Sequence, residues 1–150
     1  MSLSDHFSLM ELTKSQTAER FGIDNTPNDN AVANLKSVCE NILEPIRAHY
    51  GVPFSPSSGF RSKELNQAIG GSLRSSHLLG LAVDLEVPGI SNPDLARWLV
   101  QSKLVFDQVI LECWTGEAGS GWVHIGCSDN PRGDVLTFSR AEGYSIGLPK

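Results

Sequence analysis

Residues 75–87 read SSHLLGLAVDLEV, and the second half of this stretch has the strict alternation of a β-strand. The odd-numbered positions 81–87 are all apolar and predict a face turned to the core. Asp84 belongs to the other face, in mid-strand between apolar neighbours, where a carboxylate has to be paired, hydrogen-bonded or bound to a metal. A tight turn at Gly80 would let His77 fold back beside Asp84.

A second histidine occurs in another alternating segment, residues 122–127. Trp122, His124 and Gly126 share one face of this strand, and the residues between them share the other. Two imidazoles and one carboxylate on neighbouring antiparallel strands would supply three of zinc's four tetrahedral ligands, and an open fourth position is typical of a catalytic site. The spacing alone leaves a second interpretation open, in which a histidine and Asp84 form a hydrogen-bonded pair without a metal.

The clearest helix covers about residues 30–50, where apolar residues recur at three- and four-residue spacing. Asp29 or Asn30 can cap its start. Gly51 ends it, and Pro45 predicts a bend in its last turn. We expect this helix to be structural.

Two shorter helices and four strands complete the predicted elements. Ser62 caps one helix, and Ser91 or Asn92 caps the other. The strands are predicted at residues 81–87, 106–112, 122–127 and 135–138. Because the last three have connections too short for helical crossovers, we expect them to pair antiparallel, in an α+β fold with an antiparallel sheet.

The 150 residues are expected to form one domain, 1–150, with an irregular N-terminal arm of about residues 1–29. The formal net charge of −5, without a Lys/Arg run, gives no attraction for phosphate, so we expect neither nucleic acid nor membrane as partner. The three cysteines lack CxxC spacing and predict neither a disulfide framework nor a thiolate zinc site. Nothing at the N-terminus resembles a signal peptide, so we expect cytoplasmic synthesis, and we expect a monomer.

Four blocks of sequence follow one another along the chain. Residues 58–62 read SGFRS, residues 75–84 contain Ser-x-His-x6-Asp, residues 106–112 read FDQVILE, and residues 122–125 read WVHI. In this order they resemble the zinc D-Ala-D-Ala carboxypeptidase family of bacterial and phage peptidoglycan peptidases, and in particular its short, phage-associated, single-domain members. The resemblance implies a hedgehog/DD-peptidase-like fold, with helices packed on one side of the sheet.

The resemblance also implies site residues. His77, Asp84 and His124 would be the ligands of one Zn²⁺. Arg61 would face the substrate as a catalytic and substrate-binding residue, because a guanidinium can hold the carboxylates of a stem peptide bidentately. The alternative for Arg61 is a surface or helix-capping arginine. Ser76, beside the first ligand, would hydrogen-bond near the substrate or serve only the local turn.

One position departs from the family pattern. In several relatives an acidic residue three positions before the last histidine is the general base, and here that position is Gly121. Strand alternation puts Glu112 on the same face as Gln108 and Ile110. We therefore expect Glu112 to be the base, with Glu117 in the following loop as the second candidate. The alternative is that Glu112 is a solvated strand end.

Together these residues favour zinc-dependent hydrolysis of amide bonds in peptidoglycan stem peptides. The bond would be either the terminal D-Ala-D-Ala link, as in a carboxypeptidase, or the L-Ala-D-Glu link, as in an endolysin-type endopeptidase. Gly121 keeps an alternative open: a non-catalytic zinc-bearing binding module or virion structural module of the same fold. The expected place of action is the cell wall, reached by phage-type release or as part of a virion.

Overall fold

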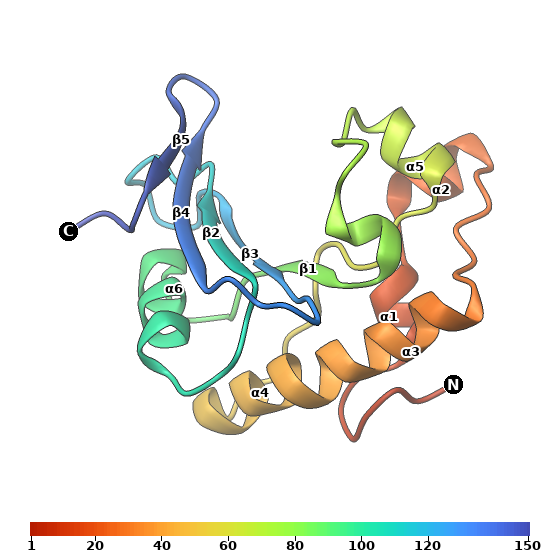
Figure 1. Ribbon diagram of the computed structural model, residues 1–150, viewed down its shortest axis with the longest axis horizontal. Helices are drawn as coiled ribbons and strands as arrows, with labels where there is room; N and C mark the ends of the chain where they lie inside the picture. Colours follow the sequence, from red (N-terminus) through yellow and green to blue (C-terminus); the bar gives the residue numbers. More distant parts are fainter.

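In the computed structural model, which describes residues 1–150, the chain folds into a five-stranded sheet with helices around it (Figure 1). The strand order is β1-β3-β2-β4-β5. The strands are β1 (Ala82–Leu85), β2 (Gln108–Glu112), β3 (Trp122–Gly126), β4 (Asp134–Ser139) and β5 (Gly143–Ile146). The predicted α+β class is confirmed, and β5 is a strand that the sequence pattern did not predict.

The sheet is mixed, so the prediction of a wholly antiparallel sheet is wrong for one pair of strands. β1 with β3, β2 with β3, and β4 with β5 are antiparallel, whereas β2 and β4 are parallel. The connection formed by residues 127–133 passes the start of β2, at Gln108, instead of returning beside β3. Since β3 itself lies between β2 and β4 in the chain, this parallel pair needs no helical crossover.

The helices, in chain order, are α1 (Leu9–Thr13), α2 (Gln16–Phe21), α3 (Asp29–Val38), the π-helical turn η1 (Cys39–Leu43), α4 (Glu44–Tyr50), α5 (Lys63–Ala68), the 3-10 turn η2 (Ser76–Leu79) and α6 (Asn92–Gln101). Ser62 and Ser91 cap α5 and α6. Asn28, one residue before the predicted caps, caps α3. None of these helices has the length and apolar character that crossing a bilayer requires.

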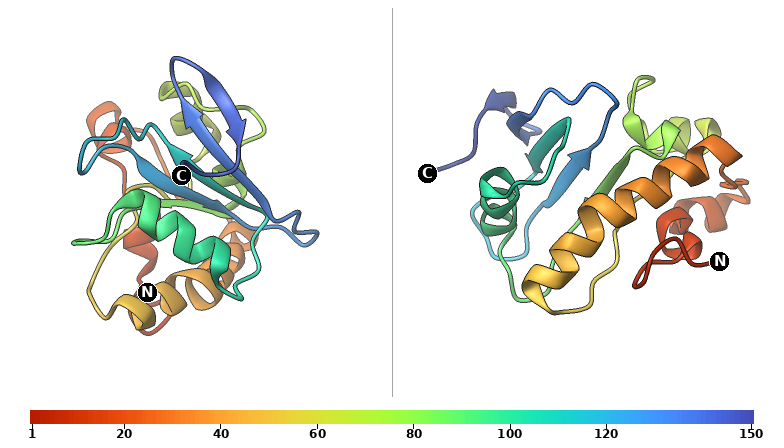
Figure 2. Two further views of the ribbon diagram at one scale, coloured as in Figure 1. Left: turned by 90° about the vertical axis from the view of Figure 1, so that its left-hand side faces the viewer. Right: turned by 60° about the horizontal axis from the view of Figure 1, so that its bottom comes forward.

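The predicted helix of residues 30–50 is one continuous rod made of α3, η1 and α4 (Figure 2). The irregularity expected at Pro45 takes the form of the π turn directly before it, in which the Glu44 N–H donates to the Cys39 carbonyl oxygen. Because proline has no N–H for the α-helical ladder, a locally wider turn accommodates it. The rod keeps one face on the core through this turn.

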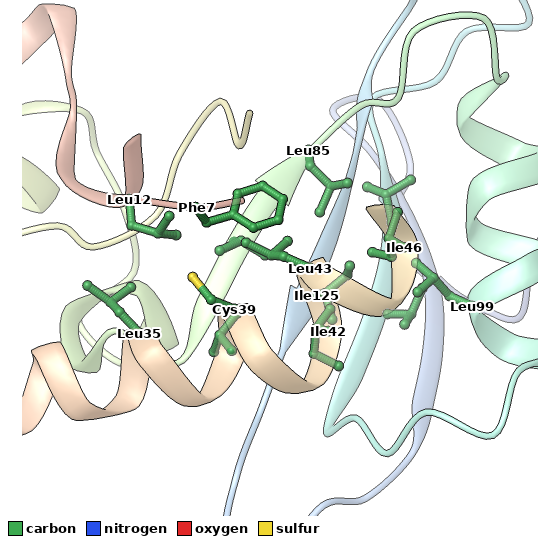
Figure 3. Close-up of a cluster of buried hydrophobic side chains, with 14 of the residues drawn as sticks. Phe7, Leu12, Leu35, Cys39, Ile42, Leu43, Ile46, Leu85, Leu99 and Ile125 are labelled. Atoms are coloured by element: carbon green, nitrogen blue, oxygen red, sulfur yellow. The ribbon is translucent and has the colours of Figure 1, made fainter. Parts of the chain in front are cut away.

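The core lies on one side of the sheet. The rod and α6 pack there against the inward-facing side chains of β1, β2 and β3 (Figure 3). The labelled side chains include Leu35, Ile42 and Ile46 of the rod, Leu99 of α6, and Ile125 of β3. Strand alternation therefore leaves Asp84, Glu112 and His124 on the opposite face of these strands.

The arm of about residues 1–29 is not irregular throughout. It contains α1 and α2, and Leu3, Phe7 and Leu12 are buried in the core. Helices of five and six residues are too short for hydrophobic periodicity to reveal. Asn25 then ties this region to the SGFRS block: its amide donates to the Phe60 carbonyl oxygen and its Oδ1 accepts from the Ser62 N–H.

Candidate metal centre

Three side chains from two parts of the chain converge above the polar face of the sheet. Asp84 on β1 and His124 on β3 are direct cross-strand partners. His77 comes from η2, and the turn back to β1 passes through Gly80 at φ +72°. One ligand atom from each residue lies within 4.8 Å of the others, so these three residues form a group that could hold a metal ion.

The hydrogen bonding of His77 fixes which ring nitrogen is free. The side chain is buried, and Nδ1 donates to the Gly59 carbonyl oxygen at 2.7 Å. In a neutral imidazole Nε2 then carries a lone pair, and this buried atom has no hydrogen-bond partner. Nε2 lies 3.4 Å from Asp84 Oδ1, so two acceptors face each other. A cation between them would satisfy both, and the donor set suits zinc.

Asp84 is held in its charged form from several sides. Its Oδ1 lies 3.0 Å from Nδ1 of His124, and its Oδ2 accepts from Arg61 Nη2 at 3.5 Å. Burial opposes ionisation, but the neighbouring imidazoles of His124 and His77 outweigh it and hold the Asp84 pKa far below its usual range. A carboxylate that stays ionised is a competent metal ligand.

Arg61 lines the cleft above the metal group, but its guanidinium is engaged within the protein. Nε donates to the Ser58 hydroxyl and Nη1 to Asn66 Oδ1, both at 3.2 Å, while Nη2 reaches Asp84. Burial lowers the Arg61 pKa, which the charges of Asp84 and Glu112 oppose. The arginine is thus neither a surface residue nor a helix cap, and it braces Asp84.

Glu112 and Gly121 lie together where β2 ends and β3 begins. Glu112 Oε1 lies 3.8 Å from Nδ1 of His124, beside the metal group. Burial raises the pKa of the Glu112 carboxyl, and the charge of Asp84 raises it further. Gly121 has φ +70°, and its backbone packs on that of residues 112–114. The position that is acidic in several relatives therefore has no room for a side chain.

A cleft of about 350 Å³ opens over the group. Side chains of β1, β2 and β3 line it, with residues 72 and 74–77 forming one wall and Arg132 and Tyr144, from the region of β4 and β5, forming the other. Ser76 and Glu112, two of the predicted site residues, line the cleft. Glu117 lies exposed in the β2–β3 loop and does not line it.

The sequence matches the family described as Peptidase M15 over residues 5–125. The chain belongs to the peptidase M15 family. This confirms the resemblance drawn from the motifs and indicates a metallopeptidase of a zinc-dependent family. No curated protein matches the sequence.

Sequence reasoning about this M15 chain missed several residues that line the cleft. Arg74 lies three positions before His77, and no motif marked it. Arg132 and Tyr144 follow the matched residues, and they reach the cleft only because β4 pairs with β2 and β5 with β4. The sequence contains no signal for the wall formed by Arg132 and Tyr144, because its pattern predicts neither β5 nor the parallel pairing of β4 with β2.

Proposed function

We propose that this M15 chain is a zinc metallopeptidase that hydrolyses amide bonds in peptidoglycan stem peptides. The observation that carries the proposal is the buried, unpartnered Nε2 of His77 facing the Asp84 carboxylate, with His124 on the next strand. Two imidazoles and one carboxylate form the ligand set of an open, catalytic zinc site.

His77, Asp84 and His124 would hold one Zn²⁺. When bound, zinc lowers the pKa of a coordinated water and polarises the carbonyl of the scissile amide. Arg61 keeps Asp84 oriented through its Nη2, and the Gly59 carbonyl oxygen keeps the ring of His77 in the tautomer that leaves Nε2 free. The protein thus holds its ligands before the metal binds.

Glu112 is the general base in this proposal. It accepts the proton of the attacking water and passes it to the leaving amine. Its carboxylate borders the metal group through His124 and lines the same cleft. Glu117 lacks both properties. The packing of Gly121 against the backbone of residues 112–114 supports this assignment, since it leaves no room for a carboxylate side chain at position 121.

The bond that is cut would be either the terminal D-Ala-D-Ala link or the L-Ala-D-Glu link of a stem peptide. The same metal group serves both, and the walls of the cleft decide between them. Action on the cell wall after phage-type release, or from within a virion, belongs to this proposal.

The experiment is incubation of the zinc-loaded protein with purified peptidoglycan, followed by analysis of newly released amines and carboxyl termini. We expect release that a chelator abolishes and zinc restores. New D-Ala would assign carboxypeptidase activity, and new N-terminal D-Glu would assign endopeptidase activity. Stoichiometric zinc binding without any release would instead identify a non-catalytic zinc-bearing module.

A further inference from the structure

The cleft is lined by three arginines, which differ in their partners. Arg61 donates to Asp84, Asn66 and Ser58. Arg132 donates through Nε and Nη2 to the two carboxylate oxygens of Asp107, at 3.0 and 2.8 Å. The positive charges of both are thus compensated by carboxylates of the protein itself.

Arg74, by contrast, makes no ion pair, and its side chain makes no hydrogen bond within the protein. It is exposed, and it lines the same cleft as the metal group. The only carboxylates that share this cleft are Asp84 and Glu112, and neither lies within ion-pair distance of Arg74. The cleft of a chain with net charge −5 therefore presents an uncompensated guanidinium.

The backbone of Arg74 is fixed relative to the metal group. Its N–H donates to the Ser72 hydroxyl at 3.2 Å. The next residue, Ser75, caps η2 by accepting from the N–H of His77. The carbonyl oxygen of Ser72 accepts from the amide of Asn66, which also holds Arg61. A guanidinium on a segment held in this way can reach only part of the cleft, so it can recognise a substrate group at a defined distance from the scissile bond.

We infer that Arg74 is a specificity-determining residue that binds a carboxylate of the substrate. This inference rests on the proposed function, and it names the group that this wall of the cleft recognises. A planar guanidinium pairs with a carboxylate through two parallel hydrogen bonds, and an amide in the same place offers one acceptor oxygen and no charge. A stem peptide carries such carboxylates at its C-terminus and on its D-glutamyl residue.

The experiment compares three synthetic stem pentapeptides: the unmodified peptide, its C-terminal amide, and the form with the D-glutamyl α-carboxylate amidated. Hydrolysis is measured with the zinc-loaded protein and its Arg74→Gln variant. Affinity is measured by calorimetry in the Glu112→Gln background, which is expected to leave the peptide intact. Arg140→Gln is the matched control, because Arg140 is exposed, lies between β4 and β5, and does not line the cleft.

We expect one of the two amidations to weaken binding and hydrolysis by about 10- to 100-fold in the parent protein, the usual effect of losing a charged hydrogen bond. The amidation that does so identifies which carboxylate is bound. Arg74→Gln should weaken binding and hydrolysis of the unmodified peptide by the same factor as that amidation, and it should no longer distinguish the unmodified from the amidated peptide. Arg74→Lys should restore part of this preference. Arg140→Gln should behave like the parent protein.

Retained discrimination in Arg74→Gln, or none in the parent protein, would overturn the inference while leaving peptide hydrolysis intact. If no peptide is hydrolysed, but the binding preference exists and depends on Arg74, the inference stands and the peptidase proposal fails. Absence of both binding and hydrolysis overturns both.

Discussion

Gly121 lies so close to Glu112 that a Cβ at position 121 would come within 2.2 Å of the Glu112 carbonyl oxygen. The same Cβ would lie 2.7 Å from the backbone of Cys113 and of Trp114. Cys113 itself has φ +59°, the only positive value at a residue other than glycine. The loop of residues 113–121 therefore begins and ends in left-handed backbone, and its two ends pack against each other beside Glu112.

Gly121→Ala should destabilise the fold by more than its left-handed backbone alone requires. That conformation costs alanine about 1–2 kcal/mol, and the overlap with the Glu112 backbone should add about 1–3 kcal/mol. Gly133→Ala is the control, since Gly133 has φ +67° and a Cβ added there would meet no atom within 4 Å. Urea unfolding measures both variants, and equal losses would mean that the loop simply shifts away.

The metal group should bind about one zinc per chain, as its three ligands predict. His77→Ala, Asp84→Ala and His124→Ala should each lose stoichiometric zinc, because two remaining ligands do not hold it. His49→Ala is the control, because His49 is exposed, stacks on Trp98 of α6 and is not a member of the metal group. Elemental analysis of the purified variants is the measurement, and zinc retained by all three ligand variants would exclude this site.

The fold should not depend on the metal, since the buried core lies on the opposite face of the sheet from the metal group. Leu35→Ala should lower the free energy of unfolding by about 2–5 kcal/mol, because Leu35 is fully buried and a cavity would remain. Lys36→Ala, on the exposed side of the same helix, should change it by less than about 0.5 kcal/mol. Circular dichroism of the chelated protein should be native, whereas unfolding on chelation would indicate a structural metal.

The metal group was predictable because local geometry determines it. Alternation along β1 and β3 puts Asp84 and His124 on one face, and the Gly80 turn returns His77 to that face. What depends on topology was not predictable in this way. The parallel pairing of β4 with β2 brings Arg132 to the cleft, and no periodicity in either strand reports which neighbour a strand will choose.

The role of Arg61 shows a second limit. Its type and its place in the SGFRS block predict contact with substrate, and this stays a prediction. The structure adds that the guanidinium donates to Asp84, Asn66 and Ser58. A sequence motif indicates that an arginine is needed, and it does not distinguish bracing a ligand from binding a substrate. The cleft arginine without a partner is Arg74. It is recognised only when the ion pairs of all three cleft arginines are compared in the structure.

Asp107 should make the stability of the protein depend on acid pH. Hydrogen bonds from the Arg132 side chain hold the pKa of Asp107 below its ordinary value of about 3.9, and its burial only partly opposes them. A group with a lowered folded-state pKa contributes stability that is complete above the unfolded value and is lost as pH falls through the folded one. Asp107→Asn should therefore be less stable than the parent protein at pH 7, and the difference should shrink below about pH 4.

Urea unfolding at several pH values between neutral and about pH 3 measures this difference directly. Asp94→Asn is the comparison, because Asp94 pairs with Arg97 on the exposed surface of α6, where such pairs contribute little. A gap between Asp107→Asn and the parent that stays constant down to the lowest pH would show that the hydrogen bonds of Asp107, and not its charge, stabilise the loop before β4.

Glu112→Gln should abolish most turnover while leaving zinc and fold in place. The amide keeps the size of the side chain but cannot accept a proton, so kcat should fall by about 10²- to 10⁴-fold, the usual contribution of general acid–base catalysis. Glu117→Gln is the matched control, since Glu117 is exposed in the β2–β3 loop and does not line the cleft. Zinc content and the urea midpoint of both variants should equal those of the parent.

Full activity in Glu112→Gln together with loss in Glu117→Gln would reverse the assignment, because the loop would then have to close over the cleft. Full activity in both would mean that neither carboxylate takes the proton from the attacking water.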